Sequence, residues 1–245
     1  MHNEMIKIKF LTIGEIASSI SFFNLEHTYN IHAEKDILKI ADTNFFENVD
    51  FIFLVADIQD EFVSKHILET ISFLMNYEVP FITILPSIKP SSKNITRVLN
   101  QITQAASIII VDDQENKDLD QFIKSLFTMV QIEKIDEYRI LEDSFSSTIM
   151  LNSIFKAKCI FYLFSNITDT YLEMPKRKRL RFWKLLEKAN TVWIDFPSLK
   201  KNEVFNEKVF TFFYENIDED ADLFTTYDET KDDLSVNVLV CNKSV

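Results

Sequence analysis

The stretch from Val49 to Leu85 decides the fold, reading VDFIFLVA at 49–56, EFVSKHILETISFLMNY at 61–77 and VPFITIL at 79–85. The first and third segments are continuous apolar runs without polar alternation, which is typical of parallel strands covered by helices on both faces. The middle segment has the length of a helix and carries apolar residues at spacings of three and four. The order strand, helix, strand predicts an α/β layered fold.

The same alternation continues outward from this stretch. A strand is expected at Ile6–Ile13, a helix at Lys93–Ala106 and a strand at Ser107–Val111. From Asp118 to about Asn152 the apolar spacing predicts a long central helix. In the second block we expect strands at Lys158–Phe164, Thr191–Phe196, Asp222–Thr226 and Leu234–Cys241. We expect helices at Pro175–Ala189 and Asn202–Glu215. An acidic loop joins the last two strands, so the second sheet is expected to be mixed.

Glycine is scarce, and this scarcity excludes several kinds of site. The chain of 245 residues contains one glycine, Gly14, whereas average usage would give roughly 17. Glycine allows a positive φ and close approach of the backbone to phosphate. A chain with one glycine can hold no Walker loop, no dinucleotide-binding fingerprint and no GxSxG elbow.

Charge and cysteine content narrow the class of protein further. The net charge of −12 disfavours an extended nucleic-acid or anionic-membrane footprint. The two cysteines, Cys159 and Cys241, form neither a disulfide framework nor a metal-ligand cluster. The four histidines show no metal-ligand spacing, so no metal site is predicted. The longest apolar runs have about six residues against the roughly 20 that span a bilayer, and we expect a cytoplasmic protein without a membrane span.

The C-terminal third has a distinctive order of elements. The segment VWIDFPSLKKNEVFNEKVFTFFYENIDEDADLF at 192–224, followed by TTYDETKDDLSVNVLVC at 225–241, reads as strands, an amphipathic helix and acidic loops. This order resembles the end of FtsZ, the bacterial relative of tubulin. In the first half, VDFIFLVADI, VPFITILP and SIIIVDD resemble three of its strands. The resemblance implies an FtsZ/tubulin-like fold: an N-terminal doubly wound, mostly parallel sheet, a long central helix and a C-terminal α+β subdomain with a mixed sheet. The corresponding boundaries are 1–116 for a degenerate nucleotide-binding-like subdomain, 117–153 for the central helix and connecting loop, and 154–245 for the C-terminal subdomain.

The phosphate-binding loops that this resemblance implies are degenerate. The family's first glycine cluster is reduced to Gly14 and Glu15, and its second, GGGTGTG, is replaced by IQDEFV at 58–63. Side chains there would crowd the phosphates, while Asp60 and Glu61 bring negative charge toward them. The rim of the expected pocket is therefore Gly14, Glu15, Asp60, Glu61, Asp112 and Asp113, the last two at the end of the strand that resembles the family's "PND" strand. We expect no GTP binding and no other cofactor.

The catalytic loop is also degenerate. In the family a motif NxDxxD enters the neighbouring subunit's pocket and orients water. The matching positions here are Leu141, Asp143 and Ser146; a competing register places Asp136 and Arg139 there. Either register lacks a needed side chain, so a water-orienting carboxylate pair cannot form. No catalytic residue is predicted, and the three matching positions are expected to serve only as an interface.

Two charged segments allow more than one interpretation. Lys176, Arg177, Lys178 and Arg179 lie in a basic run that ends at Arg181. This run fits a solvated helix face with Leu180, Trp183, Leu185 and Leu186 toward the core, a protein-docking patch or, least well, a nucleic-acid site. Nine acidic residues lie between Glu215 and Asp233, and a solvated loop explains them better than a calcium loop does. The opposite signs of the two segments suit head-to-tail association.

These observations predict a non-hydrolysing FtsZ-like protein, a pseudo-GTPase, that acts through association with a protein partner in cell division or filament regulation. The partner is expected to be a second copy or an FtsZ-type GTPase. Two alternatives remain open: a divergent GTPase that binds GTP and polymerises, and a protein-binding adaptor on the same fold without any relation to filaments.

Overall fold

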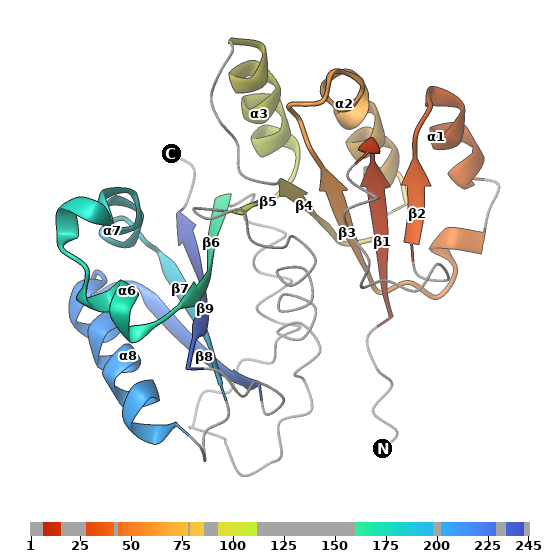
Figure 1. The fold of residues 1–245 in the computed structure, drawn as a ribbon. Helices are drawn as coiled ribbons and strands as arrows, with labels where there is room; N and C mark the ends of the chain where they lie inside the picture. Colours follow the sequence, from red (N-terminus) through yellow and green to blue (C-terminus); the bar gives the residue numbers. More distant parts are fainter. Residues whose placement is uncertain are drawn as a thin grey trace, which may run out of the picture.

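The described strands join into one nine-stranded sheet (Figure 1), in the order β2-β1-β3-β4-β5-β6-β9-β7-β8. The computed structural model describes residues 7–15, 28–41, 44–77, 79–85, 93–111, 160–197, 202–228 and 234–242. Within these residues every strand pair is parallel except the two made by β9, which is antiparallel to both β6 and β7. The expected α/β class is confirmed, as is the mixed character of the second half.

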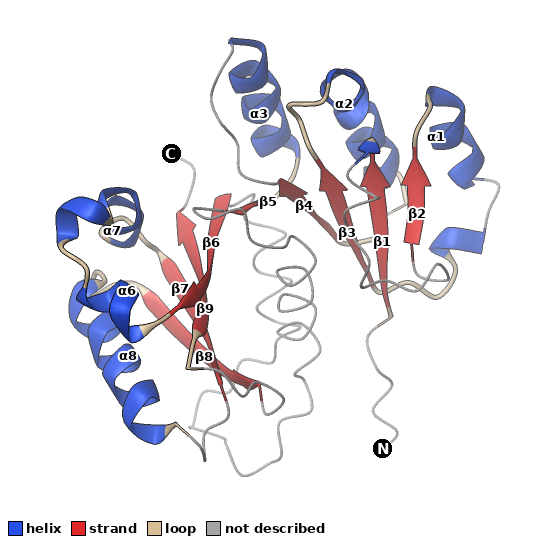
Figure 2. Cartoon of the chain, viewed as in Figure 1, coloured by secondary structure: helices blue, strands red, loops and turns tan. Residues whose placement is uncertain are grey.

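The first half alternates strands and helices. Its elements are β1 (Ile8–Ile13), β2 (Thr28–Ile31), α1 (Glu34–Ala41), a 3-10 turn (Asn44–Phe46), β3 (Phe51–Ala56), α2 (Glu61–Met75), β4 (Phe81–Leu85), α3 (Lys93–Ala105) and β5 (Ile108–Val111). Figure 2 shows α1, α2 and α3 along one side of these strands. Strand β3 is buried at all six positions, because both faces of a parallel sheet are covered.

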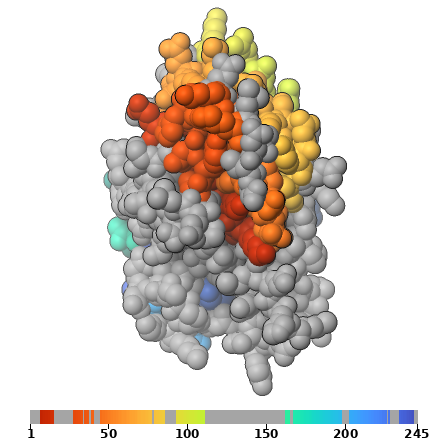
Figure 3. Space-filling view, turned by 90° about the vertical axis from the view of Figure 1, so that its right-hand side faces the viewer, coloured from red at the N-terminus to blue at the C-terminus, as the bar shows by residue number. Residues whose placement is uncertain are grey.

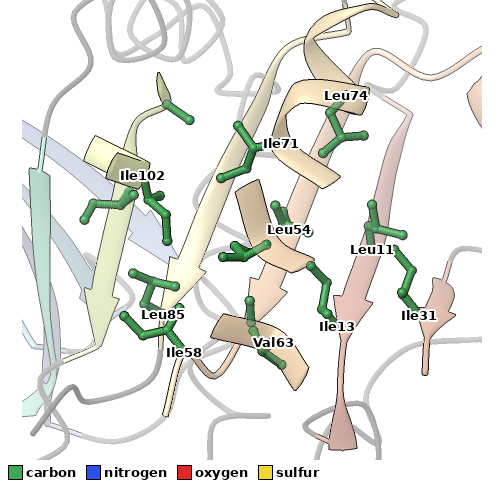
Figure 4. Close-up of a cluster of buried hydrophobic side chains, with 14 of the residues drawn as sticks. Leu11, Ile13, Ile31, Leu54, Ile58, Val63, Ile71, Leu74, Leu85 and Ile102 are labelled. Atoms are coloured by element: carbon green, nitrogen blue, oxygen red, sulfur yellow. The ribbon is translucent and has the colours of Figure 1, made fainter. Parts of the chain in front are cut away.

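The core of this half lies between the three helices and the sheet. Side chains from β1, β3 and β4 meet Val63, Ile71 and Leu74 of α2 and Ile102 of α3 (Figure 4). The opposite face of the sheet is buried as well, since Phe10 is 1% and Ile84 0% exposed. Burial on both faces explains why the strands read as continuous apolar runs.

The second half carries its own helical layer. Its elements are β6 (Ile160–Ile167), α6 (Asp169–Glu173), a 3-10 turn (Lys176–Lys178), α7 (Leu180–Leu186), β7 (Thr191–Pro197), α8 (Glu203–Asn216), β8 (Asp222–Asp228) and β9 (Val236–Asn242). Helices α6, α7 and α8 cover one face of this part of the sheet (Figure 1), around a core that includes Phe182, Val209 and Phe213.

Several details differ from the sequence-based expectation. The halves share one sheet because β5 pairs in parallel with β6, with Ile110 opposite Tyr162. The expected helix Pro175–Ala189 is instead a 3-10 turn followed by the short helix α7, in which Leu180 is 51% exposed and Leu186 is buried. Strand β2 and helices α1 and α6 were not expected. The central helix expected within 117–153 lies outside the described residues.

Candidate functional site

The carboxyl ends of β1 and β3 form the edge where a ligand of an open α/β sheet usually binds. The two strands are parallel neighbours, with Ile13 opposite Ala56. Gly14 and Asp57 therefore begin adjacent loops. This pairing brings the two degenerate loops of the sequence, 58–63 and the turn at Gly14, to the same edge.

Gly14 is in close contact with the first turn of α2. Its φ is +82°, a backbone conformation that side chains disfavour, and its N–H donates to the carbonyl of Ile31 over 2.9 Å. A Cβ atom at this position would lie 2.6 Å from Cγ2 of Val63 and 3.6 Å from Oδ2 of Asp60. The space that a glycine leaves open is thus filled by the protein's own valine.

The amino end of α2 is capped by a carboxylate of the chain itself. The Val63 N–H donates to Oδ1 of Asp60 over 3.1 Å, and the Ser64 N–H donates to the Asp60 carbonyl over 2.9 Å. Just before the helix, the Gln59 N–H donates to Oδ1 of Asp57 over 3.0 Å. A helix amino end binds anions through N–H groups of this kind, and here an aspartate accepts from the N–H of the third helical residue.

The amino end of α1, at the same edge, is closed in a similar way. Oδ2 of Asp36 accepts from the N–H groups of His32, at 3.1 Å, and Ala33, at 2.9 Å. The hydroxyl of Tyr29 donates to the Asp36 carbonyl over 3.2 Å. Burial raises the pKa of Tyr29, and the nearby Asp36 raises it further. Sequence reasoning missed this second cap, although an aspartate in the first turn of a helix is its usual signal.

The charge of the edge is negative. Asp57, Asp60 and Glu61 make no ion pair with any residue that the structure describes. Two like charges 4 Å apart repel by about 4 kcal/mol at an effective dielectric constant of about 20. The described part of the chain contains no group of three or more His, Cys, Asp or Glu side chains arranged to hold a metal ion.

The basic run forms a rigid turn on the helical layer of the second half. The Lys178 N–H donates to the Pro175 carbonyl over 2.8 Å and the Arg179 N–H to the Lys176 carbonyl over 3.0 Å. Lys176, Arg177 and Lys178 are exposed. The Lys176 ammonium pairs with Glu187 and lies 4.7 Å from the centre of the Trp183 ring.

Arg179 differs from the three cations before it, because it is only 5% exposed. Its Nε and Nη2 donate to the Met174 carbonyl over 3.0 and 2.6 Å. Its Cζ lies 5.4 to 5.7 Å from the ring centres of Trp183, Phe212 and Tyr171. Burial lowers the pKa of this guanidinium, an effect that Tyr171 partly opposes. Arg179 therefore anchors the turn and does not add to its exposed charge.

The structure brings together part of the expected site. Gly14, Glu15, Asp60 and Glu61 lie at the same edge of the sheet, whereas Asp112 and Asp113 lie outside the described residues. The expected interface positions Leu141, Asp143 and Ser146 also lie outside them. Sequence reasoning did not identify Val63 as the side chain against Gly14, since the two residues are far apart in the chain.

The architecture is similar to that of solved FtsZ and TubZ structures. An FtsZ variant from M. jannaschii aligns with a TM-score of 0.61 and 13% identity, over 98% of this chain and 92% of that one. TubZ of Clostridium botulinum phage c-st aligns with a TM-score of 0.60 and 12% identity, over 98% and 93% of the two chains. TubZ of Bacillus thuringiensis serovar israelensis, in GDP-form protofilaments, aligns with a TM-score of 0.61 and 12% identity, over 98% and 85%.

Comparison of the sequence with family models and with curated proteins found no match. The chain thus has an FtsZ/tubulin-like fold with little sequence identity to these neighbours. None of the described helices is long and apolar enough to cross a membrane.

Proposed function

We propose that this protein is a non-hydrolysing FtsZ-like pseudo-GTPase that acts through association with other protein chains. One observation carries the first part of the proposal: the amino end of α2, at the sheet edge where ligands bind, is occupied by Asp60 and packs through Val63 against Gly14.

A phosphate cradle needs backbone N–H groups that face open space. At this edge the Val63 N–H already donates to Asp60, and the side chain of Val63 fills the space beside Gly14. To accept a triphosphate, the protein would have to displace the buried side chain of Val63 and the carboxylate of Asp60, which accepts a hydrogen bond from the Val63 N–H. The ligand would also meet the negative charges of Asp57 and Glu61. Binding of GTP is disfavoured both sterically and electrostatically.

The fold supports the second part of the proposal. The structural neighbours include a protein crystallised as protofilaments and an FtsZ recorded as a dimer. We infer that this chain also associates through protein surfaces, with itself or with an FtsZ-type GTPase, and serves cell division or filament control. Loss of nucleotide binding would leave such association without a hydrolytic switch.

Isothermal titration calorimetry with GTP and magnesium tests the first part of the proposal. We expect no binding heat up to millimolar nucleotide. An FtsZ with intact glycine loops, titrated under the same conditions, is the positive control. Saturable micromolar binding would overturn the proposal and favour the alternative of a divergent GTPase.

Pelleting and light scattering test the second part. The purified chain is examined alone and mixed with an FtsZ-type GTPase that is assembling with GTP. We expect either self-association or a change in the amount of GTPase pelleted. If neither occurs, the chain is better described as an adaptor unrelated to filaments.

A further inference from the structure

The basic turn presents charge that the described part of the chain does not neutralise. We call Lys176, Arg177 and Lys178 the basic hook. The buried residue Arg179 follows the hook and anchors it, because its side chain donates two hydrogen bonds to the Met174 carbonyl. Lys176 pairs with Glu187, whereas Arg177 and Lys178 are exposed and form no ion pair with any described residue. The hook thus displays two exposed cations in a chain of net charge −12.

The end of α8 presents the opposite charge. Glu215, Asp218, Glu219 and Asp220 are exposed and are here called the acidic end. No described cation forms an ion pair with any of them. The carboxyl end of a helix favours cations, so the position of these carboxylates adds a cost within the monomer. Cations from another molecule would offset that cost.

Apolar surface lies just before the acidic end on the same helix. Phe210 is 41% and Tyr214 is 69% exposed. Their rings are stacked with centres 6.0 Å apart. Exposed aromatic residues beside charged groups are typical of protein interfaces.

Both charged features belong to one helical layer. Trp183 of α7 contacts Phe212 of α8, with ring centres 5.5 Å apart. Lys208 of α8 pairs with Asp169 and Glu173 of α6. All three helices cover the same face of the sheet (Figure 1). In a two-fold pairing of copies through this layer, a contact between the hook of one copy and the acidic end of the other is made twice.

We propose that a second copy of this chain docks on the α6–α7–α8 layer as a two-fold pair, with the basic hook of each copy against the acidic end of its partner. The inference rests on the proposed function and specifies the surface through which the chain associates with itself. It differs from the head-to-tail arrangement expected from the sequence: in a two-fold pair each contact is made reciprocally, so the assembly closes at two copies. Exposed ion pairs are individually weak, so the pair should be salt-sensitive.

Sedimentation velocity of charge-reversal variants tests this arrangement. The full chain at 50 mM salt is expected to sediment as a dimer in concentration-dependent exchange with monomer. Raising the salt to 500 mM should weaken the dimer by about tenfold or more, because screening shortens the range of exposed charges. The hook variant Arg177→Glu/Lys178→Glu and the end variant Glu219→Lys/Asp220→Lys should each be monomeric, since each places like charges together.

Mixing the two reversed variants gives the sharpest result. The mixture should dimerise, and so should a chain that carries all four substitutions, because each restores opposite charges at both contacts. The matched control is Lys65→Glu/Lys93→Glu, which makes the same charge change at exposed positions of α2 and α3. This control should dimerise like the unmodified chain.

The outcomes separate this inference from the proposed function. A chain that self-associates equally well in every variant retains the proposed function but overturns the docking surface. A ladder of species longer than two chains would contradict the two-fold arrangement. A chain that is monomeric at all salt concentrations overturns the inference, while the calorimetry and the pelleting with an FtsZ-type GTPase still decide the proposed function.

Discussion

The edge of the sheet at β1 and β3 and the helical layer α6–α7–α8 use charge in opposite ways. At the edge, carboxylates turn inward and bond to backbone N–H groups of the same chain, as Asp60 does with Val63 and Asp36 does with Ala33. On the helical layer, Arg177 and Lys178 point outward and find no ion-pair partner among the described residues. At the edge the carboxylates occupy the N–H groups that an anion would need, whereas the exposed cations of the helical layer leave it able to bind an anionic partner.

The surface of the first half agrees with this contrast. Figure 3 shows the side of the molecule on which α1 and β2 lie, with their residues in orange at its upper part. Backbone hydrogen bonds at this side join residues of the same chain, as the Gly14 N–H does when it donates to the Ile31 carbonyl. In our proposal the first half acts as a folded support, and the second half carries the surface that binds a partner.

Substitution of Gly14 by alanine should have the largest effect on stability. A side chain would have to adopt a positive φ and displace Val63, so unfolding free energy should fall by about 2–4 kcal/mol. Urea denaturation followed by circular dichroism measures the change. Lys65→Ala, at an exposed position of α2, is the control and should be close to neutral. An equally stable Gly14→Ala protein would show that the first loop does not pack on α2 as described.

The combination of Gly14→Ala with Val63→Ala sharpens this test. Trimming the valine creates space for the new Cβ but leaves the backbone strain in place. The double variant should therefore be more stable than the sum of the two single changes predicts, by about 1 kcal/mol. Strict additivity would mean that the two residues do not touch.

Substitution of Arg179 by alanine should have the next largest effect. It removes hydrogen bonds to Met174 and a guanidinium packed among three rings, and it should cost about 2 kcal/mol of unfolding free energy. Arg179→Lys should restore little, because an ammonium cannot reproduce the planar fork. Arg177→Ala, two residues earlier and exposed, should leave the thermal midpoint unchanged at 500 mM salt, where the proposed pairing of copies is weakened. Equal effects at the two positions would remove the distinction between an anchor and a displayed cation.

Substitution of Asp60 should have the smallest effect of the three. Asp60→Ala removes the cap of α2 and should cost about 1 kcal/mol, whereas Asp60→Asn keeps a capping oxygen and should cost less. Neither variant should gain GTP binding, because Val63 still fills the space beside Gly14. Calorimetry on Asp60→Asn would thus separate crowding from charge: binding gained by this variant would show that the carboxylate charge alone excludes the nucleotide.

The sequence predicts the fold well where burial is continuous. The runs around Phe51–Ala56 and Phe81–Leu85 identify strands because nearly every side chain there is buried. Strand β2 is different: it has four residues, of which only Ile31 is buried, so no apolar pattern marks it. The pairing of β5 with β6 also leaves no local signal, since the two strands are far apart in the sequence.

The candidate site is only partly predictable for a similar reason. The lack of glycine at 58–63 is a local property of the sequence, and the structure places this segment beside Gly14, where Asp60 lies at the start of α2. The burial of Arg179 is not local, because it depends on Phe212 from another helix and on the Met174 carbonyl. Composition marks Arg179 as one more surface cation, whereas tertiary packing makes it an anchor.

The most direct test of the central claim is backbone amide NMR of the chain titrated with GTP and magnesium. If Asp60 and Val63 close the amino end of α2, the amide signals of Gly14, Val63 and Ser64 will not move at millimolar nucleotide. Saturable shifts confined to these three amides would place a phosphate at the helix end and contradict the account.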